Sequence, residues 1–212
     1  MWAYVKDNKI EQIYQRPKSI MLNNVRYPSN MFTKYTDAEK EAIGIYPVED
    51  SCTKGDDNFE YTSQATYTWS ASNKKVTTSY TITAKSLVDV ENKDDSGNNI
   101  LDYKGNKTYT YGLKTLAKNL AKKQANTYIA RFNWLVERSI YDSSKAIPDV
   151  VKTYVAAIKT DCANIETAID NASDMAAFKK LYDWEYNSDG TVKTVAPIQN
   201  WSDDYDVKTY IR

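Results

Sequence analysis

Apolar and polar residues alternate in short runs at the start of the chain, which is the pattern of half-buried β-strands. The segments WAYVK at 2–6 and IEQIY at 10–14 each fit one such strand. The segment SIMLNNVRYP at 19–28 predicts two more strands about a turn at Asn23 and Asn24, because asparagine tolerates the positive φ angles of tight hairpins. Four short strands are therefore predicted at the start of the chain.

A short helix and a final strand complete this first module. Thr36 followed by Glu39 predicts a capping box, in which each side chain binds the backbone N–H of the other residue. Gly44 stands where a helix commonly ends. The segment IYPV at 45–48 then predicts a last strand or an extended exit. We predict a small strand-rich module over residues 1–50.

A second alternating pattern follows a polar linker at 49–58. Two runs of apolar residues alternate with threonine, glutamine and serine on either side of the polar sequence SNKK, and they predict a long amphipathic β-hairpin. An isolated two-stranded hairpin is marginally stable in water. We therefore expect the following helices or a neighbouring subunit to cover its apolar face, which consists of Phe59, Tyr61, Ala65, Tyr67, Trp69, Val76, Tyr80, Ile82 and Ala84.

The rest of the chain changes from turn-forming residues to helical periodicity. Residues 90–107 are rich in Asp, Asn, Gly and Lys and predict a loop, so residues 51–111 form a hairpin and loop region. From 113 onward, apolar residues recur at helical spacing at Leu113, Leu116, Leu120, Tyr128, Phe132, Leu135 and Val136. After Pro148 they form one narrow stripe at Val151, Val155, Ile158, Cys162, Ile165 and Ile169.

These patterns predict an antiparallel helical hairpin or short bundle over residues 112–186, which includes a further short helix after Ser173. An extended tail over 187–212 follows, with a turn at Asp189 and Gly190. Extended polar tails are poorly ordered unless something holds them, and we expect another chain to hold this one. Runs of strands followed by runs of helices indicate the α+β class.

The composition narrows the classes of function. The 28 basic and 28 acidic residues cancel, so we expect no nucleic-acid partner, while a near-zero net charge favours association with other copies. The chain has no histidine, which excludes Ser-His and Cys-His catalysis. Cys52 and Cys162 are far apart and are expected to be reduced thiols.

Two further features bear on location. No apolar run approaches the ~20 residues needed to span a bilayer, so we expect no membrane association. The first residues, MWAYVKDNKIEQ, also lack the pattern of a secretory signal. We therefore expect the chain to be made in a cytoplasm.

Candidate chemistry is sparse. Asp94–Asn99 reads DDSGNN, which has oxygen ligands but lacks the spacing and distal glutamate of a helix-loop-helix calcium site, so we interpret it as a turn. Lys114, Lys118 and Lys122 fall on one helix face, which is either a docking strip for an acidic partner or phosphate, or a solvated face. We expect no catalytic residue, no cofactor and no metal, and hence no enzyme.

Two regions resemble phage tail-associated proteins. The opening module, with its VRYPSNMF and AEKEAIGIYPV segments, looks like the short N-terminal domain of small phage proteins encoded beside tail fibres. The segment ANTYIARFNWLVERSIYDSSKAIPDVVKTYVAAIKT is similar to the C-terminal helical segment of phage tail-fibre-assembly-like proteins. Trp134, Arg138, Pro148 and Tyr154 occupy the matching positions, although Phe132 and Asn133 stand where such proteins often carry Thr-Asp. Together the two regions cover a little over half of the chain.

The resemblance implies protein partners and no catalysis. It leads us to expect a structural protein of the virion tail, made in the host cytoplasm, that assembles with other tail proteins and with copies of itself as a homo-oligomer. Two alternatives stay open, an assembly chaperone that leaves before the virion is complete and a carbohydrate-binding module that uses exposed aromatic rings. The residues expected at a partner interface are Trp134, Arg138, Tyr154, Lys114, Lys118 and Lys122.

Overall fold

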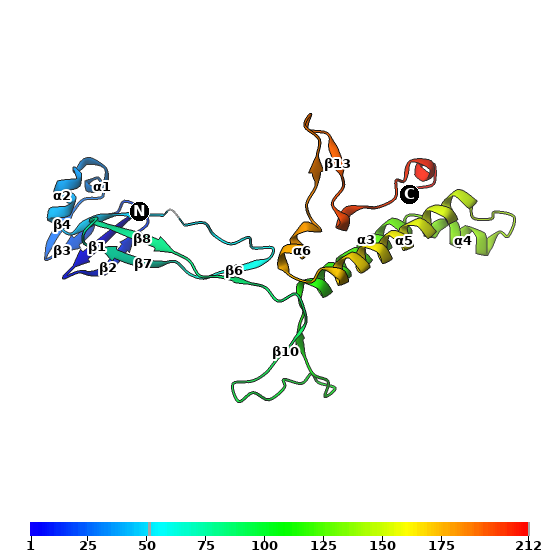
Figure 1. Ribbon diagram of the computed structural model, residues 1–212, viewed down its shortest axis with the longest axis horizontal. Coiled ribbons are helices and arrows are strands. Elements are labelled where there is room, and N and C mark those ends of the chain that lie inside the picture. The colour runs from blue at the N-terminus through cyan, green and yellow to red at the C-terminus, as the bar shows by residue number, and fades with distance from the viewer. Residues whose placement is uncertain (51, 212) are drawn as a thin grey trace. The chain divides into compact units, whose positions relative to one another are not determined.

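The computed structural model describes residues 1–50 and 52–211, and it divides into two compact units, Met1–Thr83 and Ala84–Arg212 (Figure 1). Ser51 in the predicted linker and Arg212 at the end of the predicted tail lie outside the described residues. Strands dominate the first unit and helices the second. The predicted α+β class is confirmed.

The N-terminal unit combines nine short strands with two short helices among its described residues. In chain order they are β1 (Trp2–Lys6), β2 (Lys9–Tyr14), β3 (Ile20–Leu22), β4 (Val25–Tyr27), α1 (Met31–Lys34), α2 (Asp37–Ala42), β5 (Ile45–Glu49), β6 (Glu60–Thr62), β7 (Thr66–Ser70), β8 (Lys75–Ser79) and β9 (Ile82–Ala84).

The predicted turn at Asn23 and Asn24 and the predicted helix cap at Thr36 are both present in this unit. Asn23 and Asn24 have φ angles of 49° and 64° in the β3–β4 turn, as expected for a two-residue hairpin. The capping box of α2 is present, since the Glu39 N–H donates to Thr36 and the Thr36 N–H donates to Glu39. Gly44 has a φ of +80°, and a Cβ there would lie 2.7 Å from the Val5 carbonyl oxygen. Only glycine fits that position.

The main sheet of this unit has five strands in the order β2-β1-β5-β8-β7. The pairings are antiparallel except between β5 and β8, which run parallel with Val48 opposite Val76. The edge strands β2 and β7 also approach each other, and Trp69 Nε1 on β7 donates to Asn8 Oδ1 in the β1–β2 turn at 3.3 Å. The sheet is therefore curled.

Both faces of the curled sheet carry buried side chains. The outer cluster joins the sheet to α1 and the β3–β4 hairpin and contains Tyr14, Ile20, Leu22, Met31, Phe32 and Ile45. The inner cluster contains Ala3, Val5, Val48 and Val76, with Tyr46 and Trp69 packed against it. The Tyr46 and Trp69 ring centres are 4.3 Å apart. Alternating β1 residues enter the two clusters, as the period of a strand requires.

The predicted long hairpin differs from the structure in two ways. Its inner part, β7 and β8, belongs to the N-terminal sheet through the parallel β5–β8 pairing, so the first unit ends at Thr83 rather than at residue 50. Its outer part is a separate β6–β9 pair on which Tyr61 and Ile82 are exposed. The apolar face of β7–β8 is thus covered by the curled sheet itself, where helices or a neighbouring subunit had been expected.

The second unit is built on a helical hairpin. In chain order its elements are β10 (Val90–Glu91), β11 (Tyr109–Thr110), α3 (Leu113–Ala130), α4 (Asn133–Tyr141), α5 (Asp149–Asn171), α6 (Met175–Lys180), β12 (Glu185–Tyr186), β13 (Val192–Thr194) and the 3₁₀ helices η1 (Pro197–Gln199) and η2 (Tyr205–Tyr210). Helices α3 and α5 pack against each other along their length.

The predicted loop at 90–107 is part of a structure over residues 88–111 that we call the β arm. The backbone N–H groups of Asn92, Ile100 and Thr108 donate in a ring to the carbonyl groups of Thr108, Asn92 and Ile100 at 2.9–3.0 Å. Two turns with the shared pattern Asp-x-x-Gly-Asn project from this ring. In each turn the aspartate, Asp94 or Asp102, accepts two backbone N–H groups. The interpretation of DDSGNN as a turn is confirmed.

Helix α3 buries a different face from the predicted one. The buried residues are Ala117, Ala121 and Ala125, whereas Leu116 and Leu120 are 50% and 52% exposed. Small side chains allow the two helices to approach closely, and this favours an alanine seam over a leucine stripe. The predicted stripe of α5 is confirmed at Val151, Ile158, Ile165 and Ile169, which are all buried.

Candidate assembly interface

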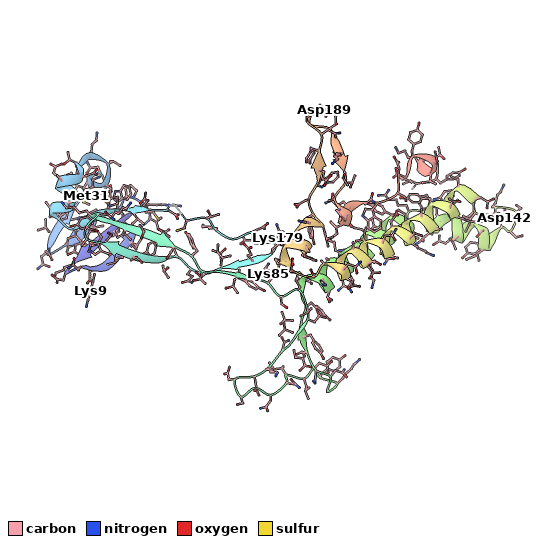
Figure 2. All side chains as sticks on the ribbon, viewed as in Figure 1. Lys9, Met31, Lys85, Asp142, Lys179 and Asp189 are labelled. Atoms are coloured by element: carbon pink, nitrogen blue, oxygen red, sulfur yellow. The ribbon has the colours of Figure 1, made fainter. Side chains whose placement is uncertain are left out.

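The segment FNWLVERSIYDSSKAIP forms the corner of the helical hairpin. Helix α3 ends at Ala130, α4 continues to Tyr141, and residues 142–148 turn the chain into α5, with Asp142 in this turn (Figure 2). The guanidinium carbon of Arg138 lies 5.1 Å from the centre of the Trp134 ring. This is the stacking expected for an arginine four residues after a tryptophan on a helix.

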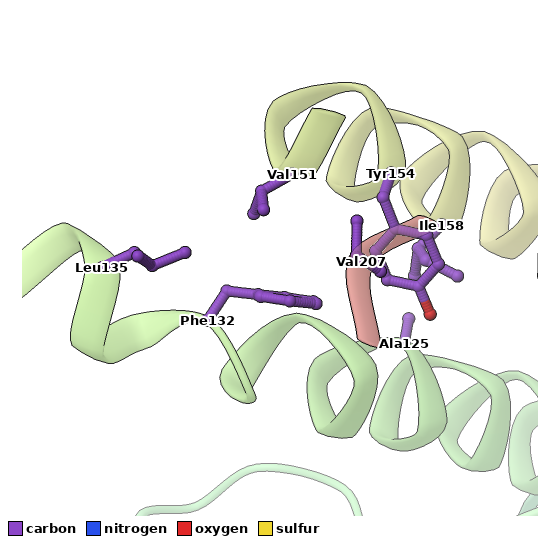
Figure 3. Packing of buried hydrophobic residues seen from close by; sticks show 7 residues of the cluster. All are labelled: Ala125, Phe132, Leu135, Val151, Tyr154, Ile158 and Val207. Carbon is purple, nitrogen blue, oxygen red and sulfur yellow. The ribbon is translucent and has the colours of Figure 1, made fainter. Parts of the chain in front are cut away.

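Trp134 and Tyr154, two of the predicted interface residues, lie against or within the core. Tyr154 is buried, and its ring meets Phe132 edge-on at 5.7 Å. Burial raises the pKa of the Tyr154 hydroxyl. Tyr154 belongs to a buried cluster, shown in Figure 3, that contains Ala125, Phe132, Leu135, Val151, Tyr154, Ile158 and Val207. Trp134 packs against this cluster. Both aromatic residues therefore contribute to the packing of the hydrophobic core.

The lysine strip faces α5. Lys118 pairs with Asp170 at 2.7 Å, and Lys122 pairs with Glu166 at 2.9 Å. Lys114 donates to the backbone carbonyl of Asp170 at 2.9 Å. The three lysines therefore bind α5 within the chain, and a role for them at a partner interface stays a prediction.

The pairing of Lys118 with Asp170 predicts that the stability of the folded chain depends on pH in the acidic range. The Lys118 hydrogen bond holds the pKa of Asp170 below its ordinary value of 3.8. A lowered folded-state pKa stabilises the folded chain above the ordinary value, and the stabilisation is lost as the pH falls through the lowered pKa. We expect Lys118→Met to raise the pKa of Asp170 toward 3.8 in an NMR titration. Lys123→Met, on the same helix, should leave it unchanged, and equal effects of the two variants would contradict the pairing.

The C-terminal tail packs on the helical hairpin. The Ser202 N–H donates to Asp161 Oδ2 at 2.7 Å, and Trp134 Nε1 donates to the Tyr210 carbonyl at 2.9 Å. Arg131 pairs with Asp204 at 3.2 Å. We expected another chain to hold the tail, and that expectation was wrong, because α3, α4 and α5 of the same chain bind it.

The tail leaves a groove open on the hairpin. The first part of the groove is a hollow of about 140 Å³ between α3, α4 and α5 with almost wholly apolar walls. Its walls include Ile129, Phe132, Val136, Ile147, Val151 and Val155. Val136 is 45% exposed. We call this hollow and its continuation the helical groove.

The second part of the groove continues along α5. Ile129 lines both parts, and the second is bounded by Lys122, Ala125, Asn126, Lys159, Cys162, Ala163 and Glu166. Successive helical residues are ~100° apart, so Asp161, which holds the tail, points about 140–160° away from Glu166 and Lys159 around α5. The tail and the groove therefore occupy nearly opposite sides of this helix.

The helical groove was not predicted from the sequence. Its lining residues Val155 and Cys162 were assigned to the packing stripe of α5, and both are only partly buried. The available signal was the breadth of the apolar surface on α5. A helix that packs on one neighbour needs a single narrow stripe, whereas α5 carries apolar residues toward α3, toward the tail and toward the groove.

The β arm is a second exposed surface. Tyr103 is 92% exposed, and Tyr109 and Tyr111 are exposed as well. Solvent-facing tyrosines are the feature that the carbohydrate-binding alternative requires. The base of the arm is fixed to α3, because the Gly112 N–H donates to Asp89 Oδ1 at 2.8 Å. A Cβ at Gly112 would lie 2.4 Å from the Val88 carbonyl carbon.

The part of the chain that the structure describes offers neither a metal site nor a helix that could cross a membrane. Within residues 1–50 and 52–211, no group of three or more Cys, Asp and Glu side chains is placed to hold a metal ion. None of the helices in that part of the chain is long and apolar enough to cross a membrane. Comparisons with protein-family models, with curated proteins and with solved structures found no match to this chain.

Proposed function

We propose that this chain is a structural protein of a phage virion tail that acts by burying surface against other proteins, without catalysis. The observation that carries the proposal is the helical groove. Its first part is a hollow with apolar walls that the chain leaves open, which is typical of a binding surface rather than of a finished core. The hollow at the start of the groove lies in the segment 125–160 that resembles the helical part of tail-fibre-assembly-like proteins.

The two-unit architecture supports an assembly role. Each unit has its own buried clusters, so each has the core that independent folding requires. The β arm adds exposed apolar residues, including Val88, Ile100 and Leu101, in a segment whose backbone is ordered by its own hydrogen bonds. Ordered apolar projections cost little conformational entropy when they bind a partner.

Quantitative mass spectrometry of purified particles tests the proposal. We expect the chain in virions of the phage that encodes it, at a constant ratio to a known tail protein across a density gradient. If the chain occurs only in the particle-free fraction of the lysate, it is not a virion component and the assembly-chaperone alternative is favoured. A capsid protein measured in both fractions is the control for particle breakage.

A further inference from the structure

The helical groove carries a charge pattern that is complementary to itself. Lys159 and Glu166 both line its α5 wall. They are seven residues apart, so they lie ~20° apart around the helix and about 10 Å apart along it. Lys159 forms no ion pair with the described residues, whereas Glu166 accepts a hydrogen bond from Lys122. An antiparallel copy of α5 would therefore place a lysine opposite a glutamate at both ends of this segment.

The centre of the segment is lined by small side chains. The midpoint between Lys159 and Glu166 falls between Cys162 and Ala163, and the facing wall of α3 contributes Ala125 and Asn126. Small residues at a helix crossing allow the helix axes to approach to ~8 Å. The small side chains therefore make room for a second helix midway between Lys159 and Glu166. An antiparallel second copy would place its own charges symmetrically about this midpoint.

We propose that the second part of the helical groove, which is bounded by Lys159, Cys162, Ala163 and Glu166, is a twofold interface in which α5 of a second copy lies antiparallel across α5. Lys159 of each copy pairs with Glu166 of the other, and the two Cys162 side chains lie beside the axis. The inference rests on the proposed assembly function and deepens it by naming a second copy as a partner. A twofold contact is closed and buries the same patch on both copies.

The proposed interface agrees with the remaining contacts of the groove. Glu166 has two carboxylate oxygens, so it can bind both Lys122 and the incoming Lys159. Antiparallel pairing about Cys162 overlaps residues 154–171 of the two helices, which is a contact about 27 Å long. With α3 of each copy, the two α5 helices form a four-helix arrangement. The tail is not displaced, because it binds the other side of α5.

Thiol cross-linking tests the position of the axis. In the full chain with Cys52→Ser, which leaves one cysteine, we expect a short bismaleimide to convert most of the protein to a dimer. Burial raises the pKa of the Cys162 thiol, so the reaction is run at mildly alkaline pH. The matched control moves the single cysteine to the exposed outer face of α5 through Cys162→Ser and Asn164→Cys, and should give monomer. Equal dimer yields from the two single-cysteine variants would overturn the proposal.

A charge exchange tests the pairing. We expect Lys159→Glu or Glu166→Lys alone to raise the dimer Kd in light scattering at least about tenfold, because each reversal creates two like-charge contacts. The double variant should bring the Kd below that of either single variant, but short of the original, because Glu166→Lys also places a second lysine beside Lys122. Lys123→Glu, outside the groove, is the control for net charge. A monomeric parent chain, or a double variant no better than the single ones, would overturn the proposal.

The two proposals fail separately. If the chain is found in virions while Cys162 gives no dimer, the tail function stands and the α5 pairing does not. If Cys162 gives the dimer while the chain is missing from virions, the interface stands and the structural role in the tail does not.

Discussion

Phe132→Ala should destabilise the helical unit by about 3–5 kcal/mol and leave the N-terminal unit unchanged. Phe132 is 3% exposed, and its ring lies between α3 and α5 against Tyr154. Its removal leaves a cavity at the point where α3 gives way to α4. Because the two units have separate cores, we expect two unfolding transitions in denaturant, with only one displaced.

Phe32→Ala provides the reciprocal experiment. Phe32 is buried in the outer cluster of the N-terminal unit, with its ring centre 4.8 Å from that of Trp2, and its loss should displace the other transition by a similar amount. Tyr141→Ala, at an exposed position of α4, should change neither by more than about 0.5 kcal/mol. Circular dichroism at a helical wavelength and tryptophan fluorescence follow the transitions. A single transition displaced equally by Phe132→Ala and Phe32→Ala would contradict the division into two units.

Val207→Asp should release the C-terminal tail at a cost of about 3 kcal/mol. Val207 is 1% exposed and belongs to the same cluster as Phe132 and Ile158 (Figure 3). A carboxylate there has to leave the cluster or be buried at a large cost. The tail can leave without unfolding the helices, so its docking free energy limits the loss. Limited trypsin digestion should then cut rapidly after Lys208.

The neighbouring residue supplies a control for the tail experiment. Thr209 is exposed in η2, so Thr209→Asp adds the same charge without burying it and should leave both the unfolding transition and the trypsin digestion close to those of the parent chain. If Val207→Asp left both unchanged as well, the tail would not be docked on the helices in solution.

Features that depend on neighbouring residues could be predicted from the sequence. The Asn23-Asn24 turn, the capping box of Thr36 and the stripe of α5 all follow from local spacing. The turn and the cap meet requirements of the local backbone, and the stripe marks one packing face of a helix. Both kinds of feature can be recognised from the spacing of residues along the sequence. The stacking of Arg138 on Trp134 was predictable for the same reason, because residues four apart on a helix are neighbours.

Features that depend on distant segments could not be predicted in the same way. The parallel pairing of β5 with β8 joins residues 28 positions apart, such as Val48 and Val76, and neither strand carries a signal for its partner. The α3 face was missed because close packing selects small side chains, and Ala117 scores lower than Leu116 on any hydrophobic scale. The helical groove depends on which side of α5 the tail covers. The tail binds the side that carries Asp161, and this leaves the opposite side of α5 open.

Cross-linking mass spectrometry of intact, purified particles tests the central claim most directly. The lysine side chains at the rim of the helical groove, Lys122, Lys152 and Lys159, are suitable sites for an amine-reactive reagent. We predict links from these lysines to a second copy of the chain and links from other lysines of the chain to further tail proteins. Particles in which the chain is absent, or in which its lysines link only within one copy, would contradict a role in tail assembly.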